Sequence, residues 1–208
     1  MNQKLMLAVG LFWIAAACGS GDDSATSVDA TAVSTSTTAA TTPVTSTTEP
    51  AAGGDAVFVI SEVVFGDDGH VAVTNIGTGP GSLDRYQICQ RPAYFGIDDI
   101  TVEAGETVYF TAGSGAGLDG EVFQAGAGFG RLRASSGEIA LYSSGSFASS
   151  DAIVSYVEWG SGNHGRSSVA VGAGIWPDGD FVATDDATTS LTADTSQAPK
   201  ASTAWTVS

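Results

Sequence analysis

The side chains best suited to recognise a ligand lie in one glycine-rich stretch, Trp159-Gly160-Ser161-Gly162-Asn163-His164-Gly165-Arg166. Aromatic and guanidinium groups on a loop supply contact area and planar hydrogen bonding, as recognition surfaces require. We expect Trp159 to be a core residue, because it shares a strand face with Val157. His164 and Arg166 are expected to be exposed, so losing Arg166 should cost little stability. The alternative is that both merely cap the loop. Three other aromatic residues are candidates for binding contacts: Tyr94, Phe95 and Trp176. Tyr94 and Phe95 lie in a predicted loop.

Paired acidic residues raise the question of a metal site. The pairs are Asp67-Asp68, Asp98-Asp99, Asp178-Gly179-Asp180 and Asp185-Asp186. Calcium needs six to eight oxygens from a shaped loop, and the stretch after Asp178 lacks the distal glutamate of the twelve-residue calcium loop. Zinc is disfavoured because the chain has only His70 and His164 and no Cys-x-x-Cys pair. We therefore predict solvated acids in turns and no metal.

The patterns of enzymes are also weak. No Gly-x-Ser-x-Gly elbow occurs. Residues 115–120 fit Gly-x-Gly-x-x-Gly, but the chain returns to glycine at Gly126, too soon for the helix that a dinucleotide site requires. We interpret this stretch, including residues 121–126, as a long loop. The sequence predicts no catalytic residue, no cofactor and no enzyme activity.

The charge balance limits the partners. Acids outnumber bases 23 to 7, and the formal net charge is −16. Such a surface repels phosphate backbones. The bases form no run, so nucleic-acid binding is not expected.

The start of the chain predicts export. Lys4 precedes an apolar run from Leu5 to Ala17. At about 13 residues, this run is too short to span a bilayer, which needs roughly 20, and the pattern is that of a signal peptide over residues 1–17. Ala15-Ala16-Ala17-Cys18 resembles the bacterial lipobox, which implies lipidation of Cys18 and anchoring to the outer face of a bacterial cell membrane or to the outer membrane. The alternative is an ordinary signal peptide with a cysteine near its cleavage site.

Two further segments follow. Residues 18–55 hold the predicted lipidated cysteine and a Ser/Thr/Ala/Pro-rich linker with few large apolar side chains, which predicts disorder. Residues 56–208 form the predicted domain. If Cys18 is lipidated, Cys89 has no partner in the chain, and we expect Cys89 to be buried.

Short β-branched and aromatic runs separated by glycine-rich turns predict strands. The candidates are Val57–Phe65, His70–Asn75, Leu83–Cys89, Glu106–Thr111, Glu138–Tyr142 and Ala152–Trp159. No stretch carries a sustained helical stripe. The pattern predicts an all-β, antiparallel β-sandwich.

Several of these runs resemble a known family, the lamin tail domains of nuclear lamins and of many exported bacterial proteins. The matching stretches are Val59–Val64, His70–Gly77, Leu83–Ile88, Val102–Phe110, Ser135–Tyr142 and Ser155–Gly160. Tyr86 stands where the family usually has tryptophan, Ala104 where it has proline and Ser155 where it has aspartate. The resemblance implies an immunoglobulin-like sandwich and a binding or tethering role without catalytic residues.

Together these features predict a membrane-anchored lipoprotein with a non-catalytic binding domain. Its partner would be a cell-envelope glycan or a protein. The alternative is an accessory module that places a separately encoded, secreted hydrolase at the cell surface.

Overall fold

The computed structural model describes residues 54–208, except 112, 116 and 126–129. The predicted signal peptide, Cys18 and nearly all of the predicted linker therefore lie outside the described residues. The described part is an all-β sandwich, as the sequence predicts.

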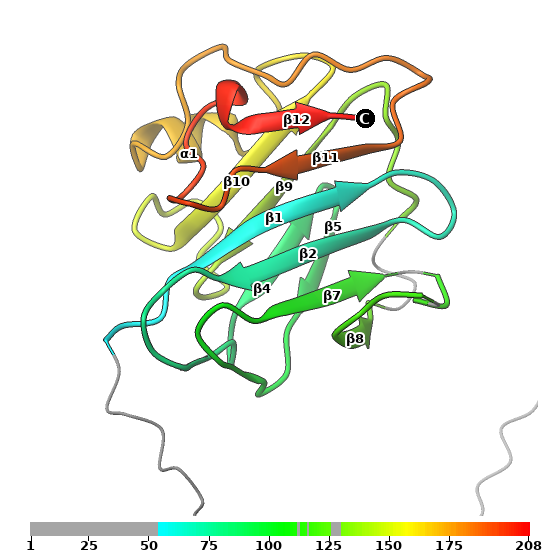
Figure 1. Cartoon of the computed structure of the whole chain (residues 1–208). Coiled ribbons are helices and arrows are strands. Elements are labelled where there is room, and N and C mark those ends of the chain that lie inside the picture. Colours follow the sequence, from blue (N-terminus) through cyan, green and yellow to red (C-terminus); the bar gives the residue numbers. More distant parts are fainter. Residues whose placement is uncertain (1–53, 112, 116, 126–129) are drawn as a thin grey trace, which may run out of the picture. The chain divides into compact units, whose positions relative to one another are not determined.

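Six strands form the first sheet. Figure 1 shows them side by side, with β8 at one edge. Their bounds are β1 Phe58–Val64, β2 His70–Asn75, β7 Thr107–Thr111, β8 Glu121–Gln124, β11 Ser190–Ala193 and β12 Trp205–Val207. The order across the sheet is β12-β11-β1-β2-β7-β8. All neighbours are antiparallel except β7 and β8, which are parallel. The predicted antiparallel sandwich is therefore confirmed, with one parallel pair at its edge. The prediction of a loop at 121–126 is wrong, because Glu121–Gln124 form strand β8.

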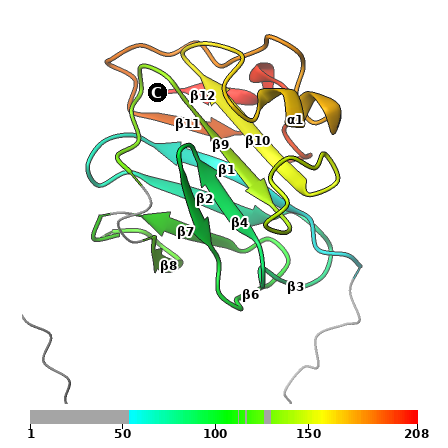
Figure 2. The same cartoon turned by 180° about the vertical axis from the view of Figure 1, so that it is seen from behind.

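Four strands form the second sheet, which Figure 2 shows from its outer side. They are β4 Gln87–Gln90, β5 Ala93–Gly96, β9 Gly137–Tyr142 and β10 Ile153–Trp159, in the order β10-β9-β4-β5. Two short strands, β3 Gly81–Ser82 and β6 Thr101–Val102, pair with each other. Among the residues that the structure describes, helical structure is limited to α1, Ser167–Gly172, and a 3-10 turn at Ser202–Ala204. None of the described helices is long and apolar enough to cross a membrane.

A β-bulge in β1 aligns its side chains with the core. The register against β2 shifts between Ile60 and Glu62, which inserts one extra residue into the strand. Ile60 and Val63 are consequently both fully buried, although they are three residues apart. The Ile60 N–H donates to the Ser155 hydroxyl on β10 at 3.0 Å. Ser155 thus joins the two sheets through the core. This is the position at which lamin tail domains, which the sequence resembles, have aspartate.

The core fills the space between the sheets. Side chains alternate along β9 and β10, so Ile139 and Leu141 face the core with Val157 and Trp159. The predicted core position of Trp159 is confirmed, since its side chain is 1% exposed. The other face of these strands carries Glu138, which is also buried.

Candidate functional site

Two buried carboxylates hold the glycine-rich loop 160–166, which connects β10 to α1. Glu138 on β9 and Glu158 on β10 are cross-strand neighbours, and they are 5% and 0% exposed. Glu158 accepts a hydrogen bond from the backbone N–H of His164 at 2.9 Å, and Glu138 accepts one from the N–H of Arg166 at 2.8 Å. The sheet therefore fixes the backbone of the loop at two points.

Both carboxylates have further donors, as buried charges require. The Ser167 hydroxyl donates to Glu158 at 2.9 Å, and the Tyr156 hydroxyl donates to Glu138 at 3.0 Å. Burial raises the pKa of Tyr156, and the neighbouring carboxylates raise it further. Tyr156 therefore stays protonated and remains a donor to Glu138.

Arg166 does not project into solvent. Its guanidinium lies 5.6 Å from the ring centroid of Tyr94 and 5.7 Å from that of Phe147. Nη1 donates to the Phe147 carbonyl at 3.0 Å, and Nη2 donates to the Tyr94 hydroxyl. The Arg166 side chain is half-buried, so the prediction that it is exposed is wrong. Two aromatic rings, both far away in the sequence, enclose it.

The aromatic candidates do not form one surface. Tyr94 and Phe95 lie on strand β5, where the sequence analysis placed a loop. Tyr94 is 39% exposed and contacts Phe147, while Phe95 turns inward against Phe110. Trp176 is 3% exposed, and its indole N–H donates to the Asp180 carbonyl at 2.8 Å. Trp176 is therefore a core residue, and Tyr94 is the most exposed of the three.

His164 lies at a different edge of the loop from the Arg166 side chain. Its Nε2 is 3.1 Å from the Ser136 hydroxyl and 3.3 Å from the Ser161 hydroxyl. Its side chain is half-buried rather than fully exposed. Ser136 also lines a pocket beside this loop, whereas His164 does not line it.

This pocket gathers arginines from distant parts of the sequence. It has a volume of about 190 Å³ and is lined by Gln90, Arg91, Arg131, Arg133, Ser136 and Glu138, together with Gly137 and Trp159. The loop contributes to its shape, because a Cβ on Gly165 would overlap the side chain of Arg91. A second pocket of about 340 Å³ shares Arg131 and Arg133. The two pockets adjoin there, and the larger reaches the lower end of the roughly 300–1,000 Å³ typical of ligand sites.

Sequence analysis did not identify these arginines as a group. Arg131 and Arg133 flank Leu132, which is 2% exposed and pairs with Gly66 in an isolated bridge. Residues two apart in an extended segment share a face, so this spacing is the signal that could have joined Arg131 to Arg133. No sequence signal predicts that Arg91 lies near Arg131 and Arg133, because its position depends on how β4 and β5 pack.

The acidic candidates serve as turn and contact residues. Asp180 accepts hydrogen bonds from the backbone and hydroxyl of Ser202 at 2.7 Å each. Asp185 accepts hydrogen bonds from the backbone N–H groups of Ala187 and Thr188. Within the described ranges, no three His, Cys, Asp or Glu side chains are grouped so that they could hold a metal ion. Cys89 is buried, as predicted.

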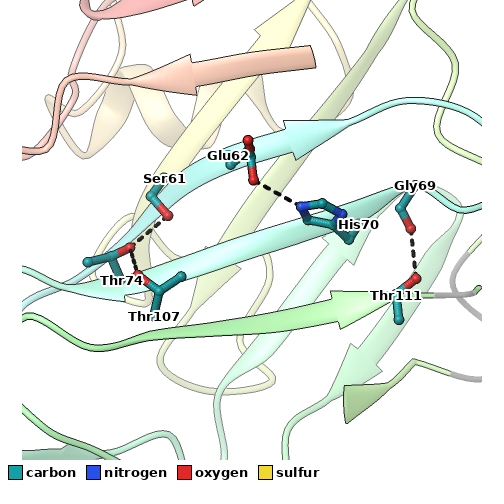
Figure 3. Close-up of polar contacts among 7 residues, drawn as sticks. All are labelled: Ser61, Glu62, Gly69, His70, Thr74, Thr107 and Thr111. Atoms are coloured by element: carbon teal, nitrogen blue, oxygen red, sulfur yellow. Dashed lines mark hydrogen bonds and ion pairs between the residues drawn. The ribbon is translucent and has the colours of Figure 1, made fainter. Parts of the chain in front are cut away.

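The outer face of the first sheet carries a separate polar network, shown in Figure 3. His70 Nε2 lies 2.9 Å from a Glu62 carboxylate oxygen. The Thr74 hydroxyl donates to Ser61 at 2.7 Å and lies 2.8 Å from the Thr107 hydroxyl. These contacts join β1, β2 and β7, and they place His70 on a different sheet from the loop that carries His164.

No protein-family model matches the chain, and no curated protein matches it. The site therefore rests on its own geometry: a fixed loop, His164 against Ser136 of the pocket lining, and three arginines around that pocket.

Proposed function

We propose that the chain is an exported lipoprotein whose lamin-tail-like domain binds or tethers a partner without catalysis. Cys18 carries the lipid anchor. This anchor holds the protein on the outer face of a bacterial cell membrane or on the outer membrane. The partner is a component of the cell envelope, either a glycan or a protein. The lipobox-like Ala15-Ala16-Ala17-Cys18 supports the anchor, and the order of the sequence motifs supports the family.

One observation carries the binding role. The fold gathers Arg91, Arg131 and Arg133 around a single pocket in a chain with a net charge of −16. Clustered arginines on an acidic protein supply the planar, charged donors that recognition uses. The buried carboxylates Glu138 and Glu158 fix the adjoining loop, which reduces the ordering cost of binding.

The test is capture of envelope material by the full chain. Purified protein, immobilised through a tag, is incubated with solubilised envelope polysaccharide and with envelope proteins, and the retained material is identified. Specific retention of either class supports the proposal. Retention of neither class, or turnover of ester or phosphate substrates that is lost in His164→Ala, contradicts it. Specific retention of a secreted hydrolase favours the accessory-module alternative.

A further inference from the structure

Basic charge is unevenly distributed in this domain. The chain has seven basic residues, and the six that follow the predicted signal peptide are Arg85, Arg91, Arg131, Arg133, Arg166 and Lys200. Three of these six line the 190 Å³ pocket. We infer that this pocket binds an acidic sugar, a carboxylate- or phosphate-bearing unit of an anionic envelope glycan. The inference rests on the proposed binding function and specifies its ligand.

Two of the three arginines lack an ion-pair partner among the described residues, although the Glu138 carboxylate also lines the pocket. Arg91 and Arg133 make no ion pair within the described residues, and Arg131 pairs with Asp67 at 3.0 Å. That pair is exposed, with side chains 60% and 81% accessible, so solvent screens it and a ligand can replace it. Guanidinium groups bind carboxylate and phosphate through two parallel hydrogen bonds. The arginine-lined wall therefore matches an anionic group.

Two other lining residues, Gln90 and Glu138, offer acceptor oxygens to the hydroxyl groups of a ligand. The Gln90 side-chain oxygen is buried and has no hydrogen-bond partner among the described residues. Glu138 lines the same pocket, and its carboxylate is an acceptor. A buried acceptor without a donor is costly, and a ligand hydroxyl would satisfy it. A simple anion without hydroxyl groups would supply no such donor, whereas an acidic sugar carries both groups.

The neighbouring pocket provides room for a polymer. It shares Arg131 and Arg133 and is lined on its other side by Ser135 and Thr188, with Asp186 and Phe65 beside them. Hydroxyl and carboxylate side chains of this kind hydrogen-bond to sugar hydroxyls. A chain of sugars could thus place one acidic unit in the smaller pocket and its neighbour in the larger one.

The experiment measures binding of four defined probes to the purified full chain by calorimetry. Trigalacturonate carries carboxylates, glucose 1-phosphate carries a phosphate ester, maltotriose is neutral, and sulfate is an anion without any hydroxyl group. At least one of the first two should bind, the better of them reporting which acid is preferred, and binding should weaken as salt rises. Maltotriose and sulfate should bind at least tenfold more weakly.

Three variants locate the site. Arg133→Gln should weaken binding of the preferred acidic sugar by about tenfold or more, since charged hydrogen bonds are lost. Gln90→Leu should weaken that binding but leave the weak binding of sulfate unchanged. Arg85→Gln is the matched control, because it removes the same charge from a side chain that is 85% exposed and lies outside the pocket. Unchanged melting temperatures verify that each variant folds.

The outcomes separate the inference from the proposed function. The acidic-sugar site would be overturned if neither trigalacturonate nor glucose 1-phosphate binds more tightly than maltotriose, or if Arg85→Gln and Arg133→Gln cause equal losses. Retention of envelope material in the capture experiment would then leave the binding role standing. If none of the four probes binds while a neutral glycan or a protein is retained, the acidic-sugar inference is wrong and the binding role remains.

Discussion

Replacing Arg166 by Met tests how strongly the loop before α1 is fixed to the second sheet. The guanidinium donates to the Phe147 carbonyl and the Tyr94 hydroxyl and lies against both rings. Met keeps an apolar, polarisable side chain of similar length between the rings. The substitution therefore removes the charge and its hydrogen bonds while leaving most of the packing.

The expected magnitude follows from these contacts. A hydrogen bond to a charged group contributes about 1.5–3 kcal/mol, and Arg166 makes two. Its Nε is buried without a partner among the described residues, and such a group costs about 1–3 kcal/mol, which offsets roughly one of the bonds. Cation–π contact adds about 0.5–1 kcal/mol. We expect Arg166→Met to lower the free energy of unfolding by about 2–4 kcal/mol.

Urea unfolding of the full chain, followed by tryptophan fluorescence, measures this loss. Arg85→Met is the control, because the Arg85 side chain is 85% exposed and should cost under about 0.5 kcal/mol. Arg166→Lys keeps the charge but not the planar fork, so its loss should be intermediate. If Arg166→Met is no more destabilising than Arg85→Met, the guanidinium does not stabilise this region and our argument is wrong.

Three more predictions follow from features described above. Trp159→Ala should cost about 3–5 kcal/mol in the same assay, as other large core truncations do, and a loss below about 1 kcal/mol would contradict a core position. Burial raises the pKa of Tyr142 from 10.0 to about 12, so the fold favours the protonated phenol. Its contribution to stability should be complete below pH 10 and decline as the pH rises towards 12. In urea titrations Tyr142→Phe should lose less stability over this range, and parallel curves would refute the assignment. Cys18→Ser should release the protein to the medium or leave uncleaved precursor, and correctly processed protein in the membrane fraction would exclude lipid anchoring at Cys18.

The strands that the sequence predicts are those with strong local signals. His70–Asn75 forms a strand with the predicted bounds, because Val71 and Val73 alternate with smaller or polar residues. The parallel strand β8 gives little signal, since its four residues Glu121–Gln124 lie between glycine-rich stretches. Helix α1 has only six residues, too few for a helical stripe to stand out.

The site could be predicted less well than the fold, because it depends on contacts between distant segments. Arg166 looks like a loop residue in sequence, but its hydroxyl partner Tyr94 is 72 positions earlier. Likewise Arg91 and Arg133 come together only after the turn between β4 and β5 packs beside the segment that precedes β9. Local pattern places Trp159 correctly in the core, since that position follows from strand alternation alone.

The central position of β1 affects the order in which the chain can fold. Val63 pairs with Val71 on one side and with Leu191, near the end of the chain, on the other. Pairing between such distant segments slows folding, because a long loop must close before the contact forms. During synthesis β1 emerges well before β11, so one of its edges stays unpaired until β11 has been made. A chain that ends before Ser190 would expose this apolar edge and should aggregate rather than fold.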